Sequence, residues 1–271
     1  MDFEQVNKFI ALVAASESET FAPMGHKLKV GLDLGTAYIV LTVVDEHNNP
    51  IACEKQAASV LRDGVVVDYI GALDIVKRLK SKLEARLDRP LLQCAIAMPA
   101  GTENSVRTHQ YVAEGAGFEV KNILDEPTAA NAIYGISDGV IVDIGGGTTG
   151  LAIFRNGQVE ATEDEPTGGT HLTLVLAGNR GISFEDAEVI KQDYSKHSEI
   201  MPVVKAVVEK MASIVKKYID IDTTNTIYLC GGTCCLTGIE DVLTSMIGIK
   251  TVKPENPFLV TPAGIAISCD V

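Results

Sequence analysis

Two similar loops constrain the fold of this chain more than any other feature of its sequence. The first runs from Val30 to Thr36, and the second runs from Val142 to Thr149. Each follows an apolar, β-branched run that predicts a buried strand, and each leads into a second strand. In both loops an aspartate stands near the strand end (Asp33 in the first, Asp143 in the second) and is followed by glycine and threonine.

This order of residue types suits a site for phosphate and a metal ion. Glycine lets the backbone turn tightly and aim N–H groups at phosphate oxygens, while aspartate holds hydrated Mg²⁺ nearby. One such loop is a weak signal, because glycine often only ends a strand. Two matched loops can face each other across a cleft and hold a triphosphate from both sides, and this is the arrangement that the sequence predicts.

The pattern around the loops is also repeated. From Leu28 the order is strand, loop, strand (39–44), turn and third strand, and from Gly139 the same order recurs. In the second copy an Asn156-Gly157 pair between alternating runs predicts a hairpin turn. We therefore expect an α/β fold with a duplicated βββα architecture, one copy in each of two lobes.

The remaining periodicities predict the other elements and the domain boundaries. Helices are expected at 72–87, 103–114, 127–134, 200–218 and 262–266, and further strands at 93–98, 118–124 and 226–230. The helices at 127–134 and 262–266 are rich in small residues, so we expect them to cross closely and act as a hinge. The predicted domains are an N-terminal helix with its linker (1–26), lobe I (27–137), lobe II (138–260) and a C-terminal helix returning to the hinge (261–271).

Charge and composition limit the possible partners. The formal net charge of −13 disfavours nucleic acid and anionic membrane surfaces. Basic residues do gather between Lys77 and Arg89, but they interleave with apolar residues at helical spacing, which predicts a solvated helix face. No apolar run approaches the roughly 20 residues that span a bilayer, and we expect a cytoplasmic protein.

The six cysteines show no paired CxxC framework, which favours reduced thiols. Cys230, Cys234 and Cys235 form a local cluster that could bind metal or respond to oxidants. Without a second pair or a nearby histidine, we favour buried small side chains.

The first residues predict a short amphipathic helix. Phe3, Val6, Phe9, Ile10 and Val13 fall on one face of it, and a polar stretch follows. Two interpretations stay open: a helix that docks on its own domain, and a detachable tag that binds a partner groove.

Five motifs in this order resemble the actin/Hsp70/hexokinase ATPase superfamily. Asp33–Thr36 resembles its first phosphate motif, Asp143–Thr148 the second, Asp125–Ala130 the first connecting motif, Leu229–Thr233 the adenosine motif and Thr261–Ala266 the second connecting motif. The resemblance implies a two-lobed actin-like fold built from two ribonuclease H-like βββαβαβα copies, with ATP and Mg²⁺ as ligands.

Other stretches resemble the EutJ family more specifically. These are Arg62–Tyr69, Pro99–Thr102, Gly168–Leu172 and Leu176–Arg180. Members of that family are encoded with bacterial ethanolamine-utilization genes and are described as candidate chaperones for ethanolamine ammonia-lyase or its microcompartment.

The superfamily resemblance also implies roles for individual residues. Asp33 and Asp143 would hold Mg²⁺ through water, and Glu126 would orient the water that attacks the γ-phosphorus, with Asp143 and Thr148 completing the catalytic group. The groups that would bind the β- and γ-phosphates are Gly35, Thr36, Gly145, Gly146, Gly147 and Thr148. The residues that would lie along the ribose or adenine are Gly231, Gly232 and Thr233. Two rivals stay open: Glu126 could cap the helix that begins at Pro127, and Gly231-Gly232 could be a tight turn only.

The chain departs from the superfamily in having little room for the capping subdomains. After the third strand the sequence passes directly to Arg62-Asp63-Gly64, and only a short stretch separates Thr170 from Ile200. We therefore expect a shallow cleft, weak nucleotide binding and slow or absent turnover.

These features predict an ATP-dependent chaperone or assembly factor of ethanolamine utilization. Its expected partner is ethanolamine ammonia-lyase or a microcompartment shell protein, and its expected place is the cytoplasm, in association with the microcompartment. One alternative is an MreB-like cytoskeletal ATPase. Another is a nucleotide-dependent activator that uses cysteine pairs for an iron–sulfur cluster. A sugar kinase is disfavoured, because no convincing substrate-activating aspartate precedes the second loop.

Overall fold

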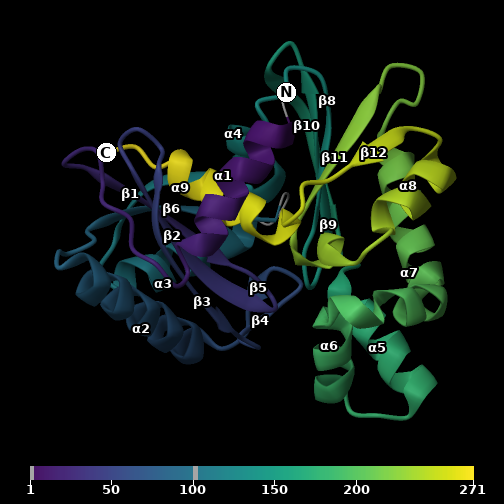
Figure 1. Cartoon of the computed structure of the whole chain (residues 1–271), viewed down its shortest axis with the longest axis horizontal. Helices are drawn as coiled ribbons and strands as arrows, with labels where there is room; N and C mark the ends of the chain where they lie inside the picture. The colour runs from purple at the N-terminus through teal and green to yellow at the C-terminus, as the bar shows by residue number, and fades with distance from the viewer. Residues whose placement is uncertain (1–2, 100–102) are drawn as a thin grey trace. The chain divides into compact units, whose positions relative to one another are not determined.

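The structure is a computed structural model that describes residues 3–99 and 103–271. Ala100–Thr102, from the turn quoted for its family resemblance, lie outside these residues. The chain forms two compact units. The first comprises the described residues up to Ile136 together with Leu259–Val271, and the second comprises Ser137–Phe258. Each unit has its own five-stranded sheet (Figure 1).

The sheet of the first unit has the strand order β3-β2-β1-β6-β7. Its strands are β1 (Leu28–Leu34), β2 (Tyr38–Asp45), β3 (Pro50–Ala57), β6 (Gln93–Met98) and β7 (Glu119–Asp125). The first three strands are antiparallel neighbours, whereas β1, β6 and β7 run parallel. The carboxyl ends of these three parallel strands therefore share one edge of the sheet.

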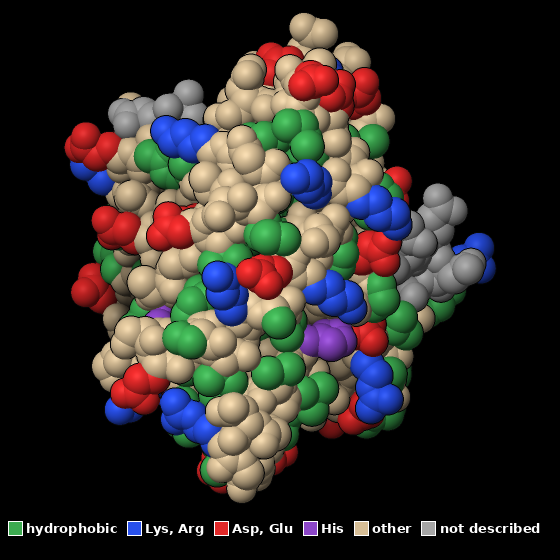
Figure 2. Space-filling view, turned by 90° about the vertical axis from the view of Figure 1, so that its right-hand side faces the viewer, with side chains coloured by type: hydrophobic (Ala, Val, Ile, Leu, Met, Phe, Trp, Pro, Cys, Tyr) green, Lys and Arg blue, Asp and Glu red, His purple; other side chains and the backbone are tan. Residues whose placement is uncertain are grey.

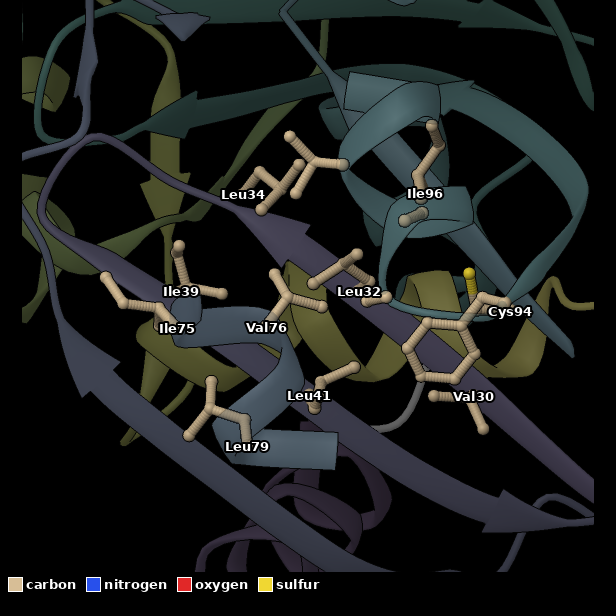
Figure 3. Close-up of a cluster of buried hydrophobic side chains, with 14 of the residues drawn as sticks. Val30, Leu32, Leu34, Ile39, Leu41, Ile75, Val76, Leu79, Cys94 and Ile96 are labelled. Atoms are coloured by element: carbon tan, nitrogen blue, oxygen red, sulfur yellow. The ribbon is translucent and has the colours of Figure 1, made fainter. Parts of the chain in front are cut away.

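Alternation along the strands divides the first unit into two apolar layers. On one face, side chains of β1 and β2 pack against α2 (Tyr69–Leu87) and α3 (Glu103–Gly115). Figure 3 shows part of this layer, with Leu32 and Leu41 beside Val76 and Leu79. On the other face, Ala95 and Ala97 of β6 pack against α4 (Glu126–Tyr134) and α9 (Val260–Ile267).

The two small-residue helices cross closely within the first unit. A Cβ atom on Gly264 of α9 would overlap the carbonyl oxygen of Ala129 in α4, so only glycine fits at this crossing. α9 follows the last strand of the second unit in the chain but packs in the first. The close approach that the sequence predicts for these helices is therefore present.

The N-terminal helix α1 (Phe3–Ala15) is docked on the first unit. Its residues Val6, Ile10 and Val13 are buried, and the Phe3 ring lies 6.3 Å from the ring of Tyr134 in α4. The segment after the helix covers the outer edge of β3, where the Cys53 amide donates to Ser16 O at 3.0 Å. Of the two interpretations that the sequence leaves open, the structure shows the docked helix.

The basic cluster on α2 is more than a solvated face, so that prediction is wrong for two of its members. Lys80 is buried, and its ammonium donates to the carbonyl oxygens of Ala116 and Gly117 after α3. The Arg86 guanidinium donates to Ser16 O at 2.8 Å and to Glu54 Oε1 at 2.8 Å. Both side chains connect neighbouring segments of the first unit, because their charged groups donate hydrogen bonds to backbone carbonyl oxygens at the ends of helices.

The second unit repeats the plan of the first. Its sheet has the order β10-β9-β8-β11-β12. The strands are β8 (Gly139–Ile144), β9 (Thr149–Arg155), β10 (Gln158–Glu165), β11 (Thr226–Cys230) and β12 (Lys250–Val252). Its helices are α5 (Gly169–Arg180), α6 (Phe184–Gln192), α7 (His197–Tyr218) and α8 (Ile239–Ile247). The predicted duplication of three antiparallel strands followed by helices and parallel strands is confirmed.

Short elements stand where the sequence leaves little room for capping subdomains. In the first unit only the hairpin of β4 (Leu61–Arg62) and β5 (Val65–Val66) separates β3 from α2. In the second unit the helix pair α5–α6 and a 3-10 turn (Tyr194–Lys196) precede α7. Among the described residues, no helix is long and apolar enough to cross a membrane.

Candidate nucleotide and metal site

The first loop joins β1 to β2 at the carboxyl end of β1. Asp33 pairs with Val40 and Leu34 with Ile39, so the turn occupies residues 35–37. Gly35 is required there, because a Cβ atom would lie 2.7 Å from Tyr38 O. Asp33 is half-buried, as are Gly35 and Thr36. The loop is a plain hairpin turn with an acidic residue at its base.

The strand order of the first unit places Glu126 on the same edge as Asp33. Asp33 stands at the end of β1, and Glu126 follows the end of β7, with β6 between them. Two interstrand steps of about 4.8 Å separate β1 from β7, so the backbones are roughly 10 Å apart. A water or metal-bound group can lie between two carboxylates at that separation.

The capping role proposed for Glu126 belongs to its neighbour. The N-cap of α4 is Asp125, whose Oδ1 accepts the Thr128 amide at 2.9 Å. The interpretation of Glu126 as the cap is therefore wrong. Glu126 occupies the first helical turn instead, where its charge is compatible with the helix dipole.

The second loop joins β8 to β9 and is buried more deeply. Asp143 pairs with Gly150, and the Gly145 amide closes the turn by donating to Thr148 O at 3.1 Å. The Asp143 side chain is only 4% exposed. The Cys230 thiol lies 3.5 Å from Asp143 Oδ2 and donates to it. A carboxylate oxygen is the kind of group that accepts hydrogen bonds from metal-bound water.

The start of α5 braces this second loop. The amide of Gly169 donates to Gly145 O at 2.9 Å, and the amide of Thr170 donates to Gly146 O at 2.8 Å. A Cβ atom on Gly168 would lie 2.6 Å from the carbonyl carbon of Gly147. The N–H groups that begin α5 are therefore bound to loop carbonyls.

The adenosine-type turn after β11 reaches the same loop. β11 runs parallel to β8 with Cys230 opposite Asp143, so Gly231 stands beside that carboxylate. Gly231 has a φ of 92°, and a Cβ atom there would overlap Asp143 Oδ1. The Thr233 hydroxyl donates to Gly145 O at 2.7 Å. Gly232 is exposed beside the Phe258 ring. The turn after β11 therefore holds the second loop in place through Thr233.

Both loops carry backbone donors that fit phosphate. In the described chain, the N–H groups of Gly146, Gly147 and Thr148 have no intramolecular acceptor, and the same holds for Gly35 and Thr36. Consecutive free N–H groups beside a carboxylate are the donor set that phosphate and hydrated Mg²⁺ require. The residues present therefore fit a magnesium–nucleotide ligand.

A buried ion pair behind the second loop escaped the sequence analysis. The Lys191 ammonium donates to Glu188 Oε2 at 2.7 Å, to Thr173 Oγ1 at 2.8 Å and to Gly169 O at 3.2 Å. Burial lowers the pKa of Lys191, and the Glu188 carboxylate opposes that shift. Burial acts to raise the pKa of Glu188, but the nearby Lys191 holds it below its usual value. The pair supports Gly169, whose own amide holds the loop.

The cysteines are all free thiols. Cys230 and Cys234 are fully buried, and burial raises the pKa of Cys234 well above its usual value, with Asp143 adding to the effect. In the part of the chain that the structure describes, no three His, Cys, Asp or Glu side chains are arranged to hold a metal ion. Cys230 and Cys234 pack as small side chains around Asp143.

Comparison with known proteins identifies the family. Residues 140–265 match the family of the cell division protein FtsA, and residues 53–177 match the MreB/Mbl protein family. The ethanolamine utilization protein EutJ of Escherichia coli (strain K12) is 40% identical over 252 residues, covering 93% of this chain and 89% of that relative. This chain belongs to the EutJ family.

Solved structures agree with this membership of the EutJ family. The crystal structure of the ethanolamine utilization protein EutJ from Carboxydothermus hydrogenoformans superimposes with a TM-score of 0.91 at 47% identity, covering 98% of this chain and 99% of that one. MreB5 of Spiroplasma citri bound to ADP gives a TM-score of 0.68 at 20% identity, covering 88% and 94%. The predicted actin-like ATPase fold, with reduced capping elements, is confirmed.

Proposed function

We propose that this EutJ-family chain binds Mg²⁺ and ATP and acts as a chaperone or assembly factor in ethanolamine utilization. The observation that carries the proposal is the pair of loops, one in each unit, with an aspartate beside backbone N–H groups that have no acceptor among the described residues. Free donors beside a carboxylate are unfavourable unless water or a ligand satisfies them. A triphosphate with Mg²⁺ would satisfy both loops at once.

In this proposal the two loops act on one nucleotide. Asp33 and Asp143 hold the hydrated metal, and the free N–H groups of residues 35–36 and 146–148 bind phosphate oxygens. Gly231, Gly232 and Thr233 lie along the nucleoside. When bound, Mg²⁺ neutralises phosphate charge, which is the chief requirement of phosphoryl transfer.

Glu126 is the proposed positioning carboxylate for the attacking water. Its place at the start of α4, on the same sheet edge as Asp33, supports this role. With small capping elements around the loops, we expect weak nucleotide affinity and slow turnover. The biological output is then a change in partner binding with nucleotide state.

Calorimetric titration of Mg-ATP tests this proposal directly. We expect Asp143→Asn to abolish binding, while Asp241→Asn, an exposed acid of the same unit, binds like wild type. Glu126→Gln should retain binding but lose phosphate release in a turnover assay, whereas the exposed Glu114→Gln should not change either. Unaltered binding by Asp143→Asn would refute the metal site.

The client is proposed from the family name. The relatives are named ethanolamine utilization proteins, and we propose ethanolamine ammonia-lyase or a shell protein of the microcompartment as the partner, in the cytoplasm. Co-purification with each candidate, with and without Mg-ATP, tests this step. Failure to capture either candidate in both nucleotide states would overturn it without touching the nucleotide site.

A cytoskeletal ATPase is the second candidate, because residues 53–177 match the MreB/Mbl family. Sedimentation in the presence of Mg-ATP distinguishes the two functions. Pelleted polymer that dissolves without nucleotide would favour filaments, whereas a soluble species under both conditions favours the assembly factor.

A further inference from the structure

A surface pocket lies in the first unit, at the end of the sheet opposite Asp33. It has a volume of about 270 Å³ and lies between the start of β1 and the connection from α2 to β6. Because β1 begins at Leu28 and the phosphate loop follows its other end, this pocket is separate from the proposed nucleotide site.

Three basic side chains line the pocket: His26, Lys27 and Arg89. The Arg89 guanidinium donates to His26 O at 2.9 Å, and the Lys27 ammonium donates to Val271 O at 2.9 Å. Within residues 3–99 and 103–271, no aspartate or glutamate side chain forms an ion pair with any of the three. Their remaining N–H donors face solvent.

The three basic side chains lie in a chain that is acidic as a whole. The formal net charge is −13, and on the face drawn in Figure 2 the basic side chains stand singly among acidic and neutral ones. Elsewhere in the described chain, Lys55, Lys121 and Lys191 each pair with a glutamate. A cluster of basic groups without an aspartate or glutamate partner attracts anions.

The floor of the pocket is apolar. Val30 and Leu91 lie beneath it and are almost fully buried, whereas Leu92 at its margin is 65% exposed. A basic rim over an aliphatic floor matches a ligand that has a carboxylate next to an aliphatic side chain. Val271 also lines the pocket, and its main-chain oxygen accepts the Lys27 ammonium.

We propose that this pocket docks an acidic peptide segment of a partner protein, with an aliphatic side chain seated on Val30 and Leu91. The volume of the pocket is just below the roughly 300–1,000 Å³ of pockets that enclose small molecules. A single aliphatic side chain with a neighbouring carboxylate therefore matches its size.

Fluorescence anisotropy with a labelled hexapeptide of alternating glutamate and leucine tests the pocket. We expect binding that weakens with added salt, and a loss of about tenfold or more in affinity in the Lys27→Glu/Arg89→Glu variant. The matched control is Lys77→Glu/Arg78→Glu, which makes the same charge change at two exposed positions of α2 in the same unit. That control should bind within about twofold of wild type.

Two further measurements test the apolar contact separately from the charged contact. A peptide with serine in place of leucine should bind weakly to wild type, and Leu92→Ser should reduce affinity for the leucine peptide only. Equal losses in both charge-reversed variants, or no saturable binding by wild type, would overturn the proposal. So would stronger binding to anionic vesicles than to the peptide. Mg-ATP titration of the Lys27→Glu/Arg89→Glu variant should match wild type, because the pocket and the phosphate loop lie at opposite ends of β1.

Discussion

The two phosphate-type loops have similar sequences but different surroundings. In the first unit, Gly35 and Thr36 are half-buried, and in the described chain the turn accepts one backbone hydrogen bond from outside the hairpin, from the Ala58 amide to Ala37 O at 2.9 Å. In the second unit, the carbonyls of Gly145 and Gly146 accept three hydrogen bonds from residues 169, 170 and 233. The second loop is therefore a fixed platform, whereas the first is a turn with few supports.

This difference shows that one motif can have two structural roles. A braced loop presents its free N–H groups in one geometry, so less entropy is lost when phosphate binds. A loop with fewer hydrogen bonds to the rest of its unit can adjust more when a ligand binds. If these contacts fix the second loop, substitutions that disturb them should lower stability more than comparable substitutions at the first loop.

The largest effect is expected at Gly168. In Gly168→Ala the new Cβ atom would press on the backbone of Gly146 and Gly147, which cannot move away cheaply. We expect the free energy of unfolding to fall by about 2 kcal/mol, the usual scale of overpacking, and Mg-ATP affinity to fall with it. Urea unfolding and hydrogen exchange over the second unit measure this.

A matched glycine in the same helix is expected to behave in the opposite way. A Cβ atom on Gly178 of α5 would meet no atom within 4 Å, so Gly178→Ala should stabilise by about 0.5–1 kcal/mol through helix propensity. If both variants change stability alike, contact between Gly168 and the loop is not what matters.

The ion pair behind the loop gives the next effect. Glu188→Gln leaves the Lys191 cation without its partner, and we expect a loss of about 2 kcal/mol, below the roughly 3–5 kcal/mol of fully buried pairs because Glu188 keeps 26% side-chain exposure. The exposed pair Lys8–Glu4 on α1 is the control. Glu4→Gln should cost less than about 0.5 kcal/mol in the same unfolding assay.

A smaller difference in stability is expected between substitutions of Thr233, which contacts the second loop, and Thr36, which lies in the first loop. Thr233→Val removes the hydrogen bond to Gly145 O and should lower the free energy of unfolding by about 1 kcal/mol. In the described chain the Thr36 hydroxyl has no hydrogen bond, so Thr36→Val should leave stability nearly unchanged while weakening Mg-ATP binding. A stability loss at Thr36 equal to that at Thr233 would contradict the weaker bracing of the first loop.

The smallest expected effect is a loss of local stability around Asp45 at low pH. Burial acts to raise the pKa of Asp45 at the end of β2, but hydrogen bonds from the Asn49 side chain and from the Met24, Asn49 and His47 amides hold it below its usual value. A lowered carboxyl pKa stabilises the fold above the unfolded-state pKa of about 4, and this contribution is lost as pH falls through the folded value. The protection factors for amide hydrogen exchange near 24–50 should therefore fall below about pH 4.

Asp45→Asn provides the control for that pH dependence. This variant should exchange faster at neutral pH and show a flatter acid response around the β2–β3 turn. Residues 145–148 should respond to neither change, because their hydrogen bonds to residues 169, 170 and 233 contain no titrating group.

Local pattern predicted much of the fold. The strands at 93–98 and 226–230 match their predicted bounds, and the helices at 103–115 and 126–134 differ from prediction by about one residue. Such elements are visible in sequence because β-branched runs and small-residue helices have short-range signatures. The elements that the sequence did not predict are the helices α5, α6 and α8 and the strands β4, β5 and β12.

The sequence predicted Asp33, Asp143 and the loop glycines directly, because each lies in a short repeated pattern that follows a β-branched run. The sequence did not predict the contacts that residues 168–170 make with the second loop, or the Lys191–Glu188 pair. It also did not predict that Asp125 caps α4, or that three basic residues line one pocket. Each of them joins groups whose proximity or capping geometry follows from packing of strands and helices. Sequence records which side chains are present, but three-dimensional packing selects which carbonyl, carboxylate or ammonium each of them meets.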